Sequence, residues 1–135
     1  MGDAFTIGRL ARDTGTKVPT IRFYEEIGLL GTPIRTASGH RRYGSGDVRR
    51  LAFIRSARKL GFSTEEIRSL LGLTEHPEQS CGAASDIARR HLGEVERHIE
   101  QLIKLRDELR AISTVCPGSN VSDCGVIAAI AHSPA

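Results

Sequence analysis

Three cysteine thiols carry the most specific chemistry in this sequence, and all of them lie after residue 80. Cys81 stands alone, whereas seven residues separate Cys116 from Cys124 in a run that begins Cys-Pro-Gly. A Pro-Gly pair favours a turn, so this loop could bring two sulfurs around one atom. Thiolates are soft ligands that favour Cu(I), Zn, Cd, Hg and similar ions. Taken alone, the two loop cysteines are explained about equally well as buried apolar side chains.

Other metal chemistries fit the sequence less well. Zinc prefers four N, S or O ligands, and here Asp123 or His76 would have to complete its site. An iron–sulfur cluster normally needs four local cysteines. His91 and His98 share one face of a predicted helix, and we interpret them as surface or dimer-interface residues. His132 lies near the end of the chain and is interpreted as incidental.

Composition narrows the class of protein. The chain has 135 residues, of which 39 % are hydrophobic, which suits one domain or two small ones. No apolar run approaches the ~20 residues of a membrane helix, and no signal-peptide pattern opens the sequence, so a cytoplasmic protein is expected. In a reducing compartment, three thiols are ligands, redox sensors or buried side chains rather than disulfides. The sequence has neither a nucleophile–base constellation nor a Gly-rich phosphate loop, and an enzyme is not predicted.

Charge is distributed unevenly along the chain. Residues 1–75 hold 13 Lys and Arg against 8 Asp and Glu, whereas residues 76–135 hold 6 against 8. The net charges are therefore +5 and −2. A basic segment of this density often faces phosphate, and the alternative is an Arg-rich solvated surface.

The amino-terminal half has the pattern of a winged helix-turn-helix. Residues 6–15 and 18–28 are predicted to form two short helices, the first capped by Thr6 and the second opened by Pro19. Two short helices joined by a few residues with a Gly form a helix-turn-helix. Residues 31–43 are predicted to form a hairpin that serves as a wing.

A second pair of helices is predicted to follow. The third helix begins at residues 45–47 and ends at Gly61. Ser63 and Glu66 form a capping-box signature that opens a fourth helix. A polar, Pro-bearing segment then predicts a hinge.

A long helix is predicted over residues 82–114. Apolar residues recur in it at the spacing of a coiled-coil seam, which Arg106 interrupts. The seam residues are Leu92, Val95, Ile99, Leu102 and Leu109. A helix of this length extends about 45–50 Å and cannot bury its stripe inside so small a chain, so we infer a homodimer. The alternative is a single helix packed on its own domain.

Three segments, residues 20–30, 35–43 and 60–67, resemble the amino-terminal signature of MerR-type transcriptional regulators. The resemblance covers nearly the whole chain, with Phe23 and His40 at positions where the family usually has Tyr. It implies an all-α fold with a small β wing: a winged helix-turn-helix domain (1–75), a hinge (76–81), an antiparallel coiled-coil dimerisation helix (82–114), and a metal-binding loop with a short C-terminal helix (115–135).

The resemblance also implies a function. Regulators of this family bind a palindrome between promoter elements that are held too far apart, and distort the DNA so that RNA polymerase can use the promoter. Such distortion costs on the order of a few kcal/mol. The residues expected to contact DNA are Lys17, Thr20, Arg22, Tyr24, Arg35, Arg41 and Tyr43. Ile21 and Phe23 are expected in the core, and the arginines of the third helix are equally well explained as solvating it.

For the thiols, the resemblance implies that Cys81 of one subunit meets Cys116 and Cys124 of the other. Three thiolates with a divalent ion, or two with a monovalent ion, leave a charge of −1. Three thiolates with a monovalent ion would bury −2, which costs more. Cys81 therefore favours Hg, Cd or Pb, with Zn less favoured.

Two alternatives stay open at this point. A Cu(I), Ag(I) or Au(I) sensor would use only Cys116 and Cys124, whose spacing resembles that of copper sensors. A thiol redox sensor on the same fold is the other. A drug-binding regulator would need a larger carboxy-terminal domain than this chain has room for.

Overall fold

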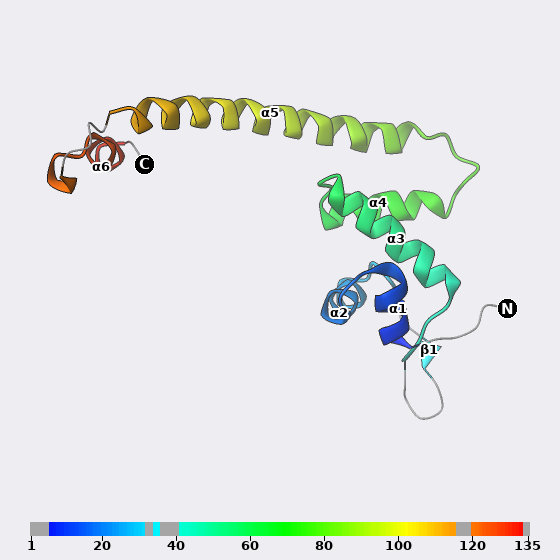
Figure 1. The fold of residues 1–135 in the computed structure, drawn as a ribbon. Coiled ribbons are helices and arrows are strands. Elements are labelled where there is room, and N and C mark those ends of the chain that lie inside the picture. The colour runs from blue at the N-terminus through cyan, green and yellow to red at the C-terminus, as the bar shows by residue number, and fades with distance from the viewer. Residues whose placement is uncertain (1–5, 32–33, 36–40, 116–119, 134–135) are drawn as a thin grey trace. The chain divides into compact units, whose positions relative to one another are not determined.

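The structure is a computed structural model that describes residues 6–31, 34–35, 41–115 and 120–133. The chain divides into two compact units, residues 1–87 and residues 88–135. Both units are mostly helical (Figure 1). Among the described helices, none combines the length and apolar character needed to cross a membrane.

The first unit opens with the two helices that the sequence predicts (Figure 1). Helix α1 spans Ile7–Thr14, and the Thr6 hydroxyl caps it by accepting a hydrogen bond from the Arg9 amide at 3.3 Å. Gly15 ends the helix in the left-handed conformation, with φ 65°, which a side chain would disfavour. Helix α2 spans Val18–Glu26 and has Pro in its first turn.

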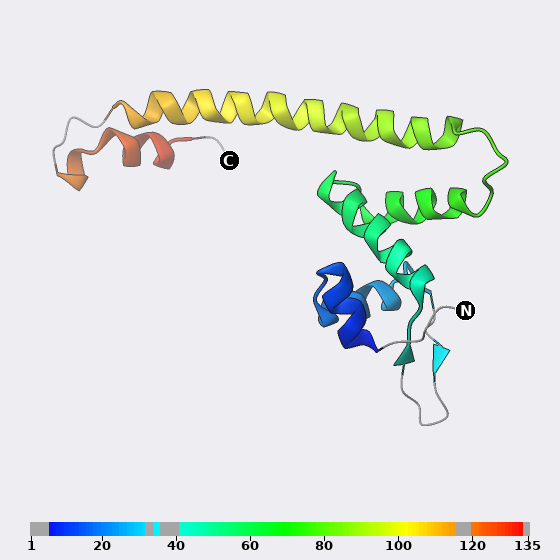
Figure 2. The ribbon, with the colours of Figure 1, turned by 45° about the vertical axis from the view of Figure 1, so that its right-hand side comes forward.

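A short strand pair follows α2 (Figure 2). Strands β1 (Ile34–Arg35) and β2 (Arg41–Arg42) run antiparallel, with Ile34 opposite Arg42 and Arg35 opposite Arg41. The pair falls within the hairpin predicted over residues 31–43, whose tip lies outside the described residues. That the pair serves as a wing stays a prediction.

Helices α3 (Ser45–Lys59) and α4 (Thr64–Thr74) complete the helix-turn-helix unit. Asp47 accepts a hydrogen bond from the Gly44 amide at 2.8 Å and so fixes the start of α3. The predicted capping box of α4 is confirmed, because the Ser63 hydroxyl accepts from the Glu66 amide at 3.1 Å and the Glu66 carboxylate accepts from the Ser63 amide at 2.9 Å.

The core of this unit joins all four helices. Six side chains from four helices and the turn after α2 are fully buried: Leu10, Ile21, Leu29, Leu51, Ile54 and Ile67. Ile21 confirms the sequence prediction, but the prediction for Phe23 is wrong, since its side chain is 48 % exposed. Helical residues lie about 100° apart, so the face that buries Ile21 and Tyr24 turns Phe23 outward.

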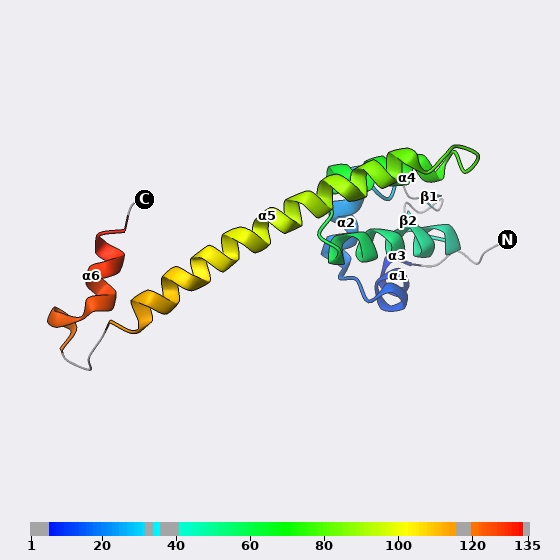
Figure 3. The ribbon, with the colours of Figure 1, turned by 90° about the horizontal axis from the view of Figure 1, so that it is seen from above.

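The long helix predicted from the apolar spacing is present as α5 (Gly82–Ser113), shown as one continuous helix in Figure 3. Ile87 is its one buried residue. The predicted seam residues Leu92, Val95, Ile99, Leu102 and Leu109 are all exposed. The stripe therefore has no partner within the described chain, as expected of a helix that dimerises, while the coiled coil itself stays a prediction.

Two short elements follow α5. A 3₁₀ turn, η1, spans Val121–Asp123, and helix α6 spans Gly125–Ala131. The sequence predicted the short apolar helix but a plain polar loop in place of η1. The turn is held by hydrogen bonds from the Asp123 amide to the Asn120 carbonyl at 2.9 Å and from the Cys124 amide to the Val121 carbonyl at 3.1 Å.

Candidate nucleic-acid interface and metal centre

Helix α2 presents the first group of predicted contact residues. Lys17 stands at its N-cap, and the side chains of Lys17 and Arg22 are exposed. Thr20 is half-buried, and Tyr24 is 8 % exposed, with its ring centroid 5.9 Å from that of Phe23. Lys17 and Arg22 can therefore reach a ligand directly, whereas Tyr24 belongs mainly to the core.

Of the predicted wing residues, the structure describes only the backbone of Arg35 and Arg41 but the whole of Tyr43. The backbones of Arg35 and Arg41 face each other across the strand pair, while their side chains lie outside the described part. Tyr43 is 3 % exposed, and its hydroxyl donates to a Glu25 carboxylate oxygen at 2.5 Å. This hydroxyl ties the end of the strand pair to α2, which is a structural role that the sequence did not predict.

Arginines on α3 and α4 bind backbone carbonyls at the end of α1 and just after α2. Arg50 donates to the Leu29 carbonyl, Arg55 to that of Thr14, and Arg68 to that of Ile27. The guanidinium has five donors in a rigid fork, which suits such ties. These bonds join residues 21 to 41 positions apart, so no local pattern in the sequence could reveal them.

A polar hollow lies where α1, α2 and α3 meet. Its volume is about 420 Å³. It is lined by Gly15, Thr16, Lys17, Thr20, Tyr24, Arg55, Arg58 and Lys59. Three of these residues, Lys17, Thr20 and Tyr24, were predicted from the sequence to contact DNA. Thr16, Arg58 and Lys59 were missed as candidates, and the basic character of the end of α3 is the signal that could have found the last two.

The thiols lie in different units, with Cys81 in the first and Cys124 in the second. Cys81 is exposed and immediately precedes α5, where its carbonyl accepts from the Ser85 amide at 2.9 Å. It also lines a cavity of about 280 Å³ whose other lining residues include Phe53, Leu70 and Leu73. The sequence did not predict this mainly apolar cavity.

Cys124 is half-buried at the N-cap of α6, and Cys116 lies outside the described residues. Gly125, directly after Cys124, packs against Val115, the residue before Cys116 in the sequence. A Cβ atom at position 125 would lie 2.6 Å from the Val115 carbonyl oxygen and 2.9 Å from a Val115 methyl group. The end of α5 and the start of α6 are therefore in close contact, and only glycine permits the approach.

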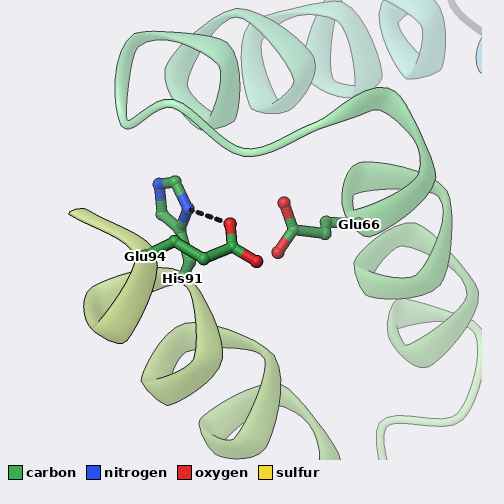
Figure 4. Close-up of side chains that lie close together, drawn as sticks. All are labelled: Glu66, His91 and Glu94. Carbon is green, nitrogen blue, oxygen red and sulfur yellow. Dashed lines mark ion pairs between the residues drawn. The ribbon is translucent and has the colours of Figure 1, made fainter. Parts of the chain in front are cut away.

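The surface interpretation of the two histidines of α5 fits His98, which is exposed, but not His91, whose side chain is only 13 % exposed. The Nδ1 atom of His91 lies 3.9 Å from a Glu94 carboxylate oxygen, one turn along the helix (Figure 4). Such a pair contributes a few tenths of a kcal/mol when the imidazole is protonated. Nothing in this geometry resembles a soft-metal site.

The sequence matches the family described as "MerR HTH family regulatory protein" over residues 5–73 and the one described as "MerR, DNA binding" over residues 48–112. It is 36 % identical over 129 residues to "Heavy metal-dependent transcription regulator 2" of Rhizobium meliloti, covering 96 % of this chain and 88 % of the relative. It is 39 % identical over 124 residues to "HTH-type transcriptional regulator CueR" of Escherichia coli, covering 90 % of each.

The fold is also similar to a solved structure. The crystal structure of the transcription regulator PbrR691 from Ralstonia metallidurans in complex with lead(II) superposes with a TM-score of 0.85. The match has 32 % sequence identity and covers 93 % of this chain and 98 % of that one.

Proposed function

Because this chain belongs to the MerR family of helix-turn-helix transcription regulators, which are not enzymes, we propose that it is a homodimeric, metal-responsive regulator of promoter DNA. It would control metal resistance or efflux genes, acting as an activator by distorting the promoter for RNA polymerase. The observation that carries the metal response is the close packing of Gly125 on Val115. This contact holds together the two chain segments that lead into Cys116 and out of Cys124.

The donor set fits a soft metal ion. Cys116 and Cys124 would hold it, and thiolates select soft ions over hard ones. Cys124 is half-buried, so a metal–thiolate bond there would be partly shielded from water. When bound, the ion would supply a cross-link between the end of α5 and the start of α6. This unit is distinct from the helix-turn-helix, in keeping with a sensor that acts on a separate DNA-binding part.

Cys81 of the partner subunit would be the third ligand, which favours a divalent ion such as Hg, Cd or Pb, and Zn less so. The exposure of Cys81 leaves its thiol accessible to a second chain. Three thiolates around a divalent ion leave one negative charge, which is less costly to bury than two. The similarity to a regulator solved with lead(II) supports the same choice.

A monovalent ion such as Cu(I) is the second candidate. The seven-residue spacing of Cys116 and Cys124 favours it, because this spacing resembles that of copper-sensing members of the family. In that case two thiolates would suffice and Cys81 would take no part. A thiol redox sensor remains the alternative of a different class.

The DNA-binding side of the proposal centres on α2. Lys17, Thr20 and Arg22 would contact DNA directly, with Tyr24 beside them, while Arg35, Arg41 and Tyr43 would contribute from the strand pair. Arginine suits bidentate recognition of phosphate or guanine. The contacts would supply the few kcal/mol, in order of magnitude, that bending and untwisting a promoter requires.

A competitive titration of the reduced full chain tests the metal assignment. Cu(I), Zn(II), Cd(II), Pb(II) and Hg(II) would be compared on the wild type, on Cys81→Ser and on the neighbouring control Ser80→Ala. Divalent ions binding once per shared site, with most affinity lost in Cys81→Ser alone, are the expected result. Tightest binding of Cu(I), unchanged in Cys81→Ser, would favour the second candidate, and failure of every ion to bind would contradict the metal response.

A further inference from the structure

The polar hollow between α1, α2 and α3 is strongly cationic. Lys17, Arg55, Arg58 and Lys59 line it, and none of the eight lining residues, all within the described part of the chain, is acidic. Four cations around one hollow repel each other unless an anion is present. The hollow therefore has the charge of an anion-binding site.

Thr16 gives this hollow a feature that charge alone does not. Its side chain is 8 % exposed, and its hydroxyl oxygen is buried with no hydrogen-bond partner among the residues that the structure describes. Buried hydroxyls are nearly always hydrogen-bonded, because leaving one unmet is costly. Thr14, two residues earlier and equally buried, follows the rule by donating to the Leu10 carbonyl at 2.7 Å. The Thr16 hydroxyl thus has an unused donor, which a rotation about the Cα–Cβ bond would turn toward a ligand in the hollow.

The cations are partly held in place. Arg55 donates one hydrogen bond to the Thr14 carbonyl and lies against Gly15, where a Cβ atom would be 3.0 Å from its guanidinium nitrogen. Arg58 donates to the Phe62 carbonyl at 2.9 Å. Each guanidinium retains further donors for a second acceptor. Fixed donors lose little freedom on binding, which favours a compact oxyanion.

The anion that the hollow would bind can be inferred from the helix beside it. Lys17 and Thr20, which line it, belong to the proposed DNA-binding helix, so the hollow continues the proposed interface from α2 onto α3. The N-terminus of α2 also lies at this wall, and its dipole favours negative charge. We propose that the hollow binds one phosphate group of the DNA backbone, with the Thr16 hydroxyl donating to a phosphate oxygen and Arg58 and Lys59 as its cationic partners. This inference rests on the proposed function in that the chain must bind DNA.

The substitution Thr16→Val tests this directly, because it removes the hydroxyl and keeps the shape. Binding of a labelled random-sequence duplex would be measured at low salt by fluorescence anisotropy. We expect affinity to fall about tenfold, as for loss of a hydrogen bond to a charged group, while the melting temperature of the free protein stays equal or rises. Thr16→Ser, which keeps the hydroxyl, should retain affinity. Thr14→Val is the matched control, and it should lower the melting temperature without weakening DNA binding.

The salt dependence of binding and a titration with inorganic phosphate complete the test. Arg58→Gln and Lys59→Gln should each make the dependence of affinity on salt less steep, because fewer cations then neutralise phosphate. Unchanged DNA affinity in Thr16→Val would overturn the inference and leave the proposed function intact, whereas a wild type that binds no duplex would contradict the proposed function itself. Inorganic phosphate that shifts the Thr16 amide resonance, with DNA affinity unaffected by Thr16→Val, would assign the hollow to a small anion and also overturn the inference.

Discussion

Gly125 is the residue that allows the two chain segments flanking the thiol loop to approach each other. The backbone beside it comes so close to Val115 that a single methyl group would overlap the carbonyl oxygen. Because the overlap involves backbone rather than the tip of a flexible side chain, the two segments would have to move apart. The described residues on either side of the loop, Val115 and Gly125, would then separate.

We therefore predict that Gly125→Ala weakens metal binding about tenfold or more, since overpacking of this kind costs about 1–3 kcal/mol. The change should leave binding of a random-sequence duplex unaltered. Gly93→Ala is the matched control, because a Cβ atom there would lie 3.6 Å from an Arg97 nitrogen, an ordinary contact. In the helix interior this control should stabilise by about 1 kcal/mol. Equal metal affinities of the two variants would contradict the prediction.

Sequence reasoning succeeds at this scale where the interaction is local. Ser63 and Glu66 are three residues apart, and their types alone predict the hydrogen bonds that both make. It fails where the partner is distant, as for Arg55 and the Thr14 carbonyl. Sequence reasoning also could not predict the buried Thr16 hydroxyl, which has no partner among the described residues. Its burial depends on packing against helices that are distant in the sequence.

Between elements, the link from Tyr43 to Glu25 connects the strand pair with α2. Tyr43 follows β2 directly and is almost completely buried, so its hydroxyl is committed to a partner inside the protein. A hydrogen bond to a carboxylate contributes about 1.5–3 kcal/mol. The link therefore fixes the base of the hairpin to the proposed DNA-binding helix.

Tyr43→Phe should lower the free energy of unfolding by about 1.5–3 kcal/mol, because the carboxylate of Glu25 loses this donor. Chemical denaturation measures the change, and DNA anisotropy on the same samples measures any direct contact. Unchanged stability with weaker DNA binding would instead mean that the Tyr43 hydroxyl meets DNA, as the sequence predicted. A loss of stability that leaves DNA affinity intact assigns the residue a structural role.

The helices themselves were largely predictable, since their ends carry strong local signals. Thr6 and Gly15 cap the two ends of α1, and Ser63 caps the start of α4, as their residue types predicted. Phe23 was misplaced because the sequence does not tell which face of α2 meets the core until Ile21 and Tyr24 are both placed. The short turn η1 was missed because a single helical turn is too short to show a repeating spacing of apolar residues.

At the scale of the whole molecule, the exposed stripe on α5 is the dominant feature. Besides the seam, Ile103 and Leu105 are also more than two-fifths exposed, and Leu102, Leu105 and Leu109 share one shallow groove. Each large apolar side chain gains about 1.5–3 kcal/mol on full burial. A partner helix over this stripe would supply the association that the family relationship leads us to expect.

The double substitution Leu102→Ser with Leu109→Ser should shift the protein from dimer to monomer in sedimentation equilibrium. The physical reason is that each subunit loses two leucines that dimerisation would bury, and a symmetric pair loses them twice. Glu100→Ser with Glu108→Ser is the control, since both glutamates are exposed on the same helix outside the seam. A wild type that sediments as a monomer, or a serine variant that stays dimeric, would refute the assignment.

The exposure of α5 also affects how fast proteases degrade a subunit that has not dimerised. Lys104, Arg106 and Arg110 stand on α5 with exposed side chains, and an isolated helix in water opens readily without packing. In a subunit without its partner, a protease that cleaves after Lys and Arg would thus reach these three bonds beside the exposed apolar stripe. Newly made chains that fail to pair would be removed first, so degradation would act as a filter that retains only assembled regulator.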